Sequence, residues 1–212
     1  MLLRYLSLPS PGDRRLGTAE RKSRQRAERE HRIVAAARVI AEREGWDAVT
    51  IRRLADEIEY SQPVLYSHFE NRDAIVAAVA VEGFQELTAD LREAASGSTG
   101  RNALKNVAMA YLAFALNRPA LYEAMFILPT SLRFASAETK PELHAGFEAI
   151  AAVVKPFCAD VEAATETFWA ALHGLAALER SGRIRPSARD ERIALVVRAL
   201  VVSENKPARR SS

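Results

Sequence analysis

Residues 50–72 concentrate side chains whose hydrogen-bonding groups complement those of double-stranded DNA. The amide of Gln62 can form two hydrogen bonds with adenine, and the guanidinium of Arg52 can do the same with O6 and N7 of guanine. Pro63 and Val64 can make apolar contacts with the methyl group of thymine. These residue types predict a surface that reads base edges in a major groove.

Neighbouring residues have the chemistry to contact the DNA backbone. Tyr66, Ser67 and His68 carry polar tips that can bond phosphate oxygens, and the N-terminus of a helix that begins near Arg72 is a potential anion site. Such contacts fix the register of a protein on the duplex more than its sequence preference. The complete set of candidate DNA-contacting residues is Thr50, Arg52, Arg53, Gln62, Pro63, Val64, Tyr66, Ser67, His68 and Arg72.

Three predicted helices carry this set. A helix over residues 26–44 is followed by a short helix over residues 51–58, for which Thr50 is a favourable N-cap. Ser61 can cap a third short helix, whose first turn tolerates Pro63 because the N–H groups there have no helical partner. Two short helices joined by a tight turn and preceded by a supporting helix form a helix-turn-helix, whose second helix can enter a major groove.

The apolar residues of the third helix predict which of its side chains face outward. Leu65 and Phe69 lie four residues apart and are expected to face the core, so the other side chains between residues 62 and 68 are expected to point largely to solvent. Asn71 is the expected N-cap of a long helix over residues 72–95.

Positive charge is concentrated before the first expected helical domain. Residues 14–32 carry eight Arg or Lys and three Glu, a local charge of +5, whereas residues 33–82 carry −4 and the whole chain +3. With its Pro and Gly residues, the segment over 1–26 suits a flexible or conditionally helical arm. The arm could contact DNA or could simply be solvated, and the sequence leaves both open.

The composition indicates a folded, all-helical protein. The chain has 212 residues, of which 49% are hydrophobic and 27% charged, and its apolar residues recur at spacings of three and four without sustained alternation. A linker is expected at residues 96–100. Further helices are expected near residues 101–117, 119–128, 139–156, 160–180 and 188–203.

No pattern in the sequence indicates catalysis, a bound metal or a cofactor. There is no His-Glu-x-x-His, Gly-rich phosphate loop or Gly-x-Ser-x-Gly, the four His residues are scattered, and Cys158 is the only cysteine. The longest apolar runs are shorter than the roughly 18 to 20 residues that span a bilayer. We therefore expect neither an enzyme nor a membrane protein, and interpret the chain as cytoplasmic.

Residues 33–84 resemble the DNA-binding domain of the TetR family of bacterial regulators. The resemblance is carried by the run from Thr50 to Ala55 and by the run from Ser61 to Phe69, with its Leu-Tyr-x-His-Phe core, followed by Arg72. It implies that the positions matching Arg52, Gln62, Pro63 and Val64 face bases and that those matching Thr50, Tyr66, His68 and Arg72 lie at the backbone. It also implies an all-helical homodimer that binds an operator and has a variable C-terminal ligand domain.

The stretch over residues 168–175 is similar to the Trp-His-Gly signature of one C-terminal subgroup of that family, here Trp169, His173 and Gly174. The resemblance implies a four-helix dimer interface built from the last two long helices, whose broad apolar faces suit packing within the chain or against a partner. The implied domains are an arm over 1–26, the helix-turn-helix domain over 27–84, a ligand-binding and dimerisation domain over 85–205 and a disordered tail over 206–212.

Aromatic and Met residues in the C-terminal domain could surround a cavity for a largely apolar small molecule. The same residues could equally be plain core, and His173 could bond the backbone. The candidate pocket residues are Tyr111, Tyr122, Met125, Phe126, Phe147, Trp169 and His173.

The turn between the two short helices departs from the family pattern. Where a glycine followed by an apolar residue is usual, this chain has Glu59 and Tyr60. If the turn needs a positive φ, Glu59 carries backbone strain of about 1 kcal/mol, and its carboxylate lies near phosphates.

Two functional hypotheses follow. The first is a ligand-responsive homodimeric regulator, most often a repressor in this family, that binds a palindromic operator. The second is a dimeric small-molecule-binding or protein-interaction module whose helix-turn-helix no longer binds DNA specifically, which the charge of −4 and Glu59 motivate. Neither the effector nor the operator can be named from the sequence.

Overall fold

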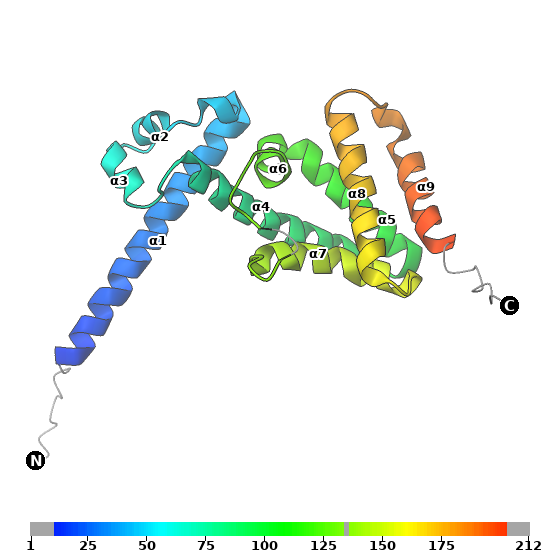
Figure 1. Ribbon diagram of the computed structural model, residues 1–212, viewed down its shortest axis with the longest axis horizontal. Coiled ribbons are helices and arrows are strands. Elements are labelled where there is room, and N and C mark those ends of the chain that lie inside the picture. The colour runs from blue at the N-terminus through cyan, green and yellow to red at the C-terminus, as the bar shows by residue number, and fades with distance from the viewer. Residues whose placement is uncertain (1–10, 134–135, 203–212) are drawn as a thin grey trace, which may run out of the picture. The chain divides into compact units, whose positions relative to one another are not determined.

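The computed structural model describes residues 11–133 and 136–202, and every regular element in those ranges is a helix (Figure 1). The expected all-α fold class is confirmed. The helices are α1 (Pro11–Glu44), α2 (Ile51–Glu57), α3 (Gln62–Tyr66), α4 (Arg72–Ala95), α5 (Gly100–Asn117), α6 (Pro119–Phe126), α7 (Pro141–Val154), α8 (Val161–Arg180) and α9 (Arg189–Val202). Short 3₁₀ turns lie at Trp46–Ala48, Lys155–Phe157 and Pro186–Ala188. None of the described helices combines the length and the apolarity that a membrane span requires.

The chain divides into two compact units within α4, the first ending at Ile75 and the second beginning at Val76. Each unit has its own core. The predicted tail over residues 206–212 and the first ten residues of the predicted arm lie outside the described residues.

Helix α1 begins at Pro11, so the prediction that the first helix starts near residue 26 is wrong. Of the two conformations considered for the arm, the helical one is present over residues 11–26. Pro11 is compatible with a helix start because the first helical N–H has no partner to lose. Gly17 costs only about 1 kcal/mol relative to Ala, and most of the surrounding residues are strong helix formers such as Arg, Lys, Glu and Gln. Arg26 and Glu30 add an i,i+4 ion pair at 2.8 Å.

The core of the first unit joins α1 to both short helices. Ile33, Ala37 and Ile40 of α1 are completely buried, as are Leu54 of α2 and Leu65 of α3. The burial of Leu65 confirms the predicted inward face of α3. Because α3 is only five residues long, this packing and not its intrinsic propensity holds it in place.

The turn after α2 places Glu59 in the left-handed region, with φ 56°. The N–H of Tyr60 donates to the carbonyl of Ala55 at 2.9 Å, which is the six-to-one hydrogen bond of a Schellman motif. Glycine is the usual residue at this position, and Gly182 occupies it at the end of α8, with φ 68°. The conditional prediction for Glu59 is confirmed: the turn needs a positive φ and a side chain bears it.

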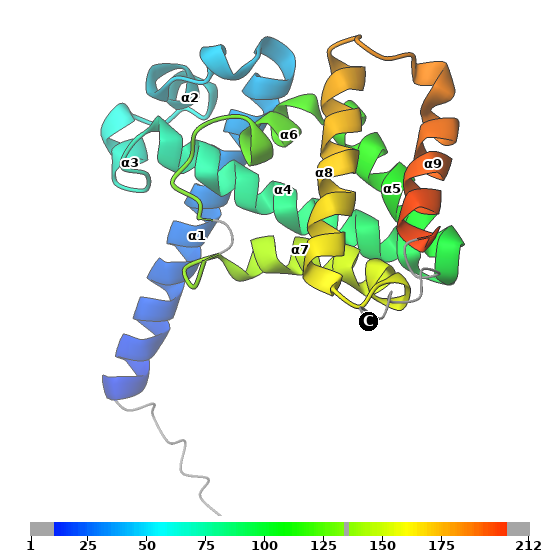
Figure 2. The same cartoon turned by 45° about the vertical axis from the view of Figure 1, so that its right-hand side comes forward.

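The second unit is organised around α5, which packs against α6, α7, α8 and α9. Figure 2 shows α8 and α9 as an antiparallel pair with α5 beside them. At Gly83 of α4 an added Cβ would lie 2.6 Å from Sδ of Met125 in α6, so only glycine fits there without displacing Met125. In contrast, a Cβ at Gly174 would meet nothing within 4 Å in the described part of the chain.

A buried ionic cluster fixes α9 to α8. The side chain of Glu179 is 2% exposed and accepts hydrogen bonds from Arg189, whose Nε lies 3.1 Å from Oε1, and from Arg192, whose Nη2 lies 3.2 Å from Oε2. The hydrogen bonds from Arg189 lower the pKa of Glu179 below its usual range, against the effect of its burial.

Replacing Glu59 with glycine should stabilise the first unit. Relief of the left-handed strain outweighs the larger backbone entropy that glycine loses on folding, so we expect Glu59→Gly to raise the free energy of unfolding by about 0.5 to 1 kcal/mol. Chemical denaturation measures the change. Glu59→Gln is the control, because it removes the charge and keeps the strain. A gain of the same size in the control would show that charge, not φ, is the cause.

Replacing Glu179 with glutamine should loosen the α8–α9 pair. The two guanidinium groups lose their counter-charge, and because they are partly solvated we expect a loss of about 2 to 3 kcal/mol in thermal or denaturant unfolding. Since the pKa of Glu179 is lowered by folding, its contribution is present above the ordinary Glu range and is lost as the pH falls through the lowered value. The difference from wild type should therefore shrink in acid. The exposed Glu191→Gln on α9 should change stability little, and an equal loss there would contradict this account.

Candidate nucleic-acid interface and ligand cavity

Helices α2 and α3 pack against each other and present polar side chains to solvent. Tyr66 is 54% exposed although it is a large aromatic residue. Half of the predicted DNA-contacting set is exposed on these two helices and at the residue that follows α3. These residues are Arg52, Gln62, Pro63, Tyr66 and Ser67.

Thr50, Arg53 and Val64 have local structural partners. Thr50 caps α2, since its Oγ1 accepts a hydrogen bond from the N–H of Arg53 at 3.1 Å. The guanidinium of Arg53 pairs with Glu57 at 2.6 Å and with Glu44 at 3.3 Å, and the hydrogen bond to Glu57 raises the pKa of Arg53. Val64 is half-buried. Any contact of Arg53 with a phosphate would therefore compete with two carboxylates.

The prediction that His68 points outward is wrong. Its side chain is 6% exposed, and Nδ1 lies 3.2 Å from Oε1 of Glu30 on α1. Arg26 also bonds Glu30 and donates to the backbone carbonyl of Ser67 at 3.3 Å. The Leu-Tyr-x-His-Phe run thus uses its histidine to attach the end of α3 to α1, and the spacing alone could not show this because the partner lies 38 residues earlier.

Arg72 also has a structural role that the sequence did not indicate. Its Nε donates to the carbonyl of Val49 at 2.8 Å and its Nη2 to the carbonyl of Trp46 at 2.6 Å. The side chain therefore closes the turn between α1 and α2. Asn71 caps α4 as predicted, with Oδ1 accepting from the N–H of Ala74 at 2.9 Å.

Sequence reasoning missed one further pair at the helix-turn-helix. Arg32 of α1 donates from Nη1 to the hydroxyl of Tyr60 at 2.9 Å, and its guanidinium lies 5.0 Å from the centre of the Tyr60 ring. A cation–π contact of this kind explains why an aromatic residue follows Glu59 in the turn. An Arg and a Tyr 28 residues apart carry no local signal of this pairing.

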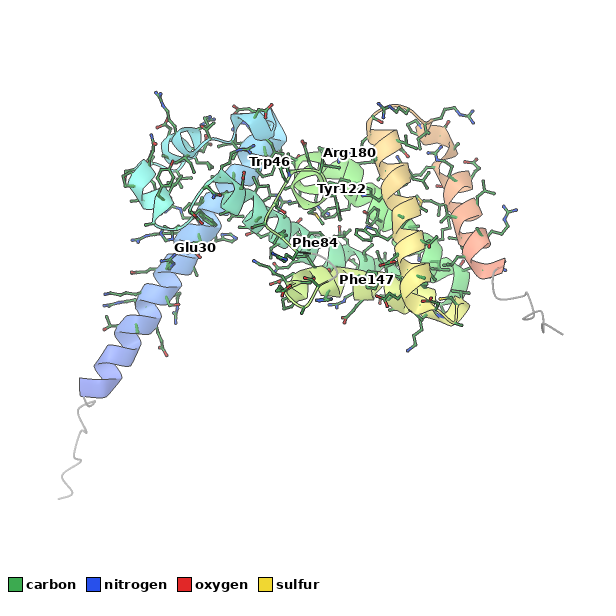
Figure 3. All side chains as sticks on the ribbon, in the orientation of Figure 1. Glu30, Trp46, Phe84, Tyr122, Phe147 and Arg180 are labelled. Carbon is green, nitrogen blue, oxygen red and sulfur yellow. The ribbon has the colours of Figure 1, made fainter. Side chains whose placement is uncertain are left out.

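The second unit contains a cavity of about 190 Å³. Its wall is mostly aromatic and aliphatic, and Figure 3 marks Phe84 on α4 and Phe147 on α7, which belong to it. Phe126 packs against Phe84 and Trp169 with ring centres 5.3 and 6.0 Å apart. The lining residues are Phe84, Leu87, Tyr111, Phe126, Thr139, Leu143, His144, Gly146, Phe147, Ile150, Glu162, Glu166 and Trp169.

A chain of four hydrogen-bonded side chains begins at two residues of this wall, Trp169 and Tyr111. Nε1 of Trp169 donates to the hydroxyl of Tyr111 at 3.0 Å, the two tyrosine hydroxyls are 3.2 Å apart, and the hydroxyl of Tyr122 lies 2.6 Å from Nδ1 of His173. Because Trp can only donate, the chain is complete when each hydroxyl donates to the next group and neutral His173 accepts at Nδ1. Burial lowers the pKa of His173 and raises that of Tyr122 to about 12, which favours these neutral forms.

The structure divides the predicted pocket residues between two pockets. Tyr111, Phe126, Phe147 and Trp169 line the aromatic cavity described above. A second pocket shares Phe126 and Trp169 with it and adds Met125 and His173. Tyr122 lines neither, and the guanidinium of Arg180 lies 5.1 Å from the centre of its ring; Figure 3 labels both residues.

Replacing Arg72 should destabilise the first unit rather than remove a phosphate contact alone. Arg72→Lys keeps the charge but cannot donate to both carbonyls in the same geometry. We expect it to lower the free energy of unfolding by about 1 to 3 kcal/mol. Arg52→Lys is the matched control on an exposed arginine and should leave stability within about 0.5 kcal/mol of wild type. Unchanged stability of Arg72→Lys in chemical denaturation would contradict the structural role.

Comparison with known proteins relates both units of the chain to one family of bacterial regulators. Residues 33–79 match the family described as bacterial regulatory proteins, tetR family, and residues 104–200 match the family described as tetracyclin repressor-like, C-terminal domain. An uncharacterized helix-turn-helix-type transcriptional regulator of Mycobacterium tuberculosis is 31% identical over 154 residues, which cover 71% of this chain and 69% of the relative. A second such regulator, of Bacillus subtilis, is 34% identical over 95 residues, covering 45% of this chain and 50% of the relative.

Solved structures show the same fold. A protein of unknown function from Rhodococcus has a TM-score of 0.69 at 25% identity and covers 84% of this chain and 95% of its own. A tetracycline repressor variant from Acinetobacter baumannii, in complex with minocycline, has a TM-score of 0.58 at 19% identity and covers 81% and 93%. The sequence families and the M. tuberculosis relative, together with the exposed residues of α2 and α3, show that this chain belongs to the TetR family of DNA-binding transcriptional regulators, which is not a family of enzymes.

Proposed function

We propose that the protein is a cytoplasmic homodimeric repressor that binds a palindromic operator and dissociates from it when a small, largely apolar effector binds. The observation that carries the proposal is the continuity of α4. This helix begins at Arg72, which closes the turn beside α2, and its later residues Phe84 and Leu87 line the cavity of the second unit. A ligand that displaces this wall therefore acts on the helix that leads directly into the DNA-binding unit.

Base recognition is assigned to the exposed residues of α2 and α3. Gln62 and Arg52 are the residues proposed to bond bases, with Pro63 and Val64 against a thymine methyl group. Tyr66 and Ser67 are proposed to contact phosphates. The other residues predicted to lie at the DNA backbone are proposed to act chiefly by holding the helices in position; they are Thr50, Arg53, His68 and Arg72.

Dimerisation is assigned to α8 and α9. The apolar residues expected to form the interface are largely used within the chain, since Phe168, Leu172 and Ile193 are buried. Leu178 of α8 and Leu195 of α9 remain exposed, the latter at 57%, and Gly174, one helical turn before Leu178, has open space at its Cβ position. A second copy packed over these residues would complete a four-helix interface in which each copy buries the same patch of the other.

The effector would act by population shift. If it favours a state in which the two DNA-binding units are wrongly spaced, a coupling free energy of about 1 to 3 kcal/mol lowers operator affinity about 5- to 150-fold. The size of the release therefore depends on the difference in effector affinity between the two states.

The second candidate function is a ligand-binding dimer without specific DNA binding. The confirmed left-handed Glu59 favours it, because its carboxylate lies in the turn between the two DNA-binding helices. Sequence-specific DNA binding that persists at physiological salt would favour the first function, and its loss would favour the second.

Gln62→Ala should separate base reading from backbone binding. We expect it to weaken binding to the operator by about 1 to 3 kcal/mol and to leave random DNA unaffected, because only the operator offers the bonded base. Fluorescence anisotropy is measured on DNA flanking the gene of this protein and on a scrambled duplex, between about 50 and 200 mM salt. Gln85→Ala, an exposed glutamine of the second unit, is the control. Equal losses on both duplexes would exclude base reading by Gln62, and equal binding of wild type to both at high salt would favour the second function.

A further inference from the structure

The charges around the aromatic cavity have one sign. Glu162 and Glu166 line it, whereas no Lys or Arg of the described residues does. Across residues 138–169, which include α7 and the first half of α8, there are six acidic residues and two lysines. Neither lysine lies on the cavity wall. The Asp, Glu, Lys and Arg residues on the described cavity wall are therefore all acidic.

The two glutamates belong to one stripe of α8 that faces the cavity. Glu162, Glu166 and Trp169 are spaced at i, i+4 and i+7, so their side chains lie on the same face of the helix. Both carboxylates are exposed, and within the described residues neither forms an ion pair with Lys or Arg. Glu162 alone could be explained by the favourable position of an acidic residue in the first turn of a helix. Glu166, one turn later, has no such explanation.

Most of the other polar groups on the wall already have partners among the described residues: Thr139 accepts a hydrogen bond from the N–H of Ser136, whereas the exposed His144 forms no side-chain hydrogen bond with them. The hydroxyl of Tyr111 and Nε1 of Trp169 are used in the hydrogen-bonded chain that ends at His173. Apart from His144, a ligand in the cavity therefore meets aromatic faces rather than free donors of the described residues. An anionic ligand would lose its hydration without gaining a cationic partner, which is costly.

Aromatic faces and uncompensated carboxylates favour the opposite charge. A cation is attracted by the faces of Trp, Tyr and Phe rings when it lies within about 6 Å of the ring centre. Rings from five helices meet at this cavity, among them Phe84, Phe126, Phe147 and Trp169. The apolar surface would take a hydrophobic body, and the carboxylates of α8 would take the charge.

We propose that the effector of this protein is a lipophilic organic cation, with its apolar body between α4, α6 and α7 and its positive charge beside Glu162 and Glu166. That this ligand acts as an effector rests on the proposed function, whereas the prediction that it binds the cavity does not. The cavity residues that determine specificity are then the two glutamates, which sequence reasoning did not select because acidic residues on an exposed helix face are usually only solvated.

Three probes of similar apolar character but different charge test the proposal. They are benzyltriethylammonium, the neutral amide N,N-diethyl-2-phenylacetamide and the anion phenylacetate. Isothermal titration calorimetry on the full chain without DNA gives the three affinities. We expect the cation to bind at least fivefold more tightly than the amide and phenylacetate to bind most weakly. The proposal is overturned if the amide or phenylacetate binds as tightly as the cation, or if none of the three binds.

Charge-neutral variants identify the groups responsible. We expect Glu162→Gln and Glu166→Gln each to weaken binding of benzyltriethylammonium about two- to fivefold and the double variant about tenfold, with the affinity for the amide unchanged. Because both residues are exposed and lack ion pairs among the described residues, these variants are expected to fold, which thermal unfolding checks. Glu148→Gln on α7 is the matched control, since it removes an exposed carboxylate that does not line the cavity. An unchanged affinity in the double variant, or an equal loss in the control, would refute the assignment.

The same probes separate this inference from the proposed function. Benzyltriethylammonium is added to the protein bound to its operator, and DNA release is followed by anisotropy. Release by the cation, lost in the double glutamine variant, supports both. Binding of the cation without release retains the ligand class and contradicts the effector role. Operator binding by a protein that ignores the cation contradicts the ligand class alone.

Discussion

The free-energy cost of burying a polar group without a hydrogen-bond partner determines how several helices of this protein are joined. In the first unit, Arg72 bonds the carbonyls of Trp46 and Val49, and thereby fixes the start of α4 to the turn before α2. In the second unit, Glu179 can remain buried only because α9 supplies two guanidinium groups. The Arg72 contacts join residues 23 and 26 positions apart, and the Glu179 contacts join two consecutive α-helices. The apolar cores supply most of the stability, whereas these polar contacts select one arrangement of the helices.

The same constraint shapes the ligand cavity. The four side chains from Trp169 to His173 satisfy one another, so the inner wall offers aromatic faces with few free polar groups. The carboxylates of Glu162 and Glu166, which form no ion pair among the described residues, lie on exposed turns of α8. Selectivity by charge is then separated from selectivity by shape. Apolar packing favours any hydrophobic ligand of suitable size, and the carboxylates discriminate among such ligands by their charge.

Local patterns in the sequence predicted local structure well. Thr50 and Asn71 cap the helices that they were expected to cap, Leu65 is buried, and the residue at position 59 adopts a positive φ. Capping and helical periodicity depend on residues within one or two turns, so a single sequence contains them. His68, Arg72 and the start of α1 were placed wrongly or incompletely. Their conformations depend on partners up to 38 residues away, or on weak propensities summed over many residues.

The basic arm illustrates why a local charge is a poor guide to a binding surface. The charge of +5 over residues 14–32 left both DNA contact and solvation open, whereas in the structure Arg26 bonds both Glu30 and the carbonyl of Ser67, and Arg32 bonds Tyr60. These two cations orient α3 and the turn before it. A five-residue helix cannot maintain its own orientation, so α1 must supply it. Neutralising Arg26 would therefore alter how α3 presents Gln62, whereas the exposed Arg21 and Arg24 could act on DNA only through their charge. The contacts of Arg26 and Arg32 therefore give this part of α1 a structural role in the first unit.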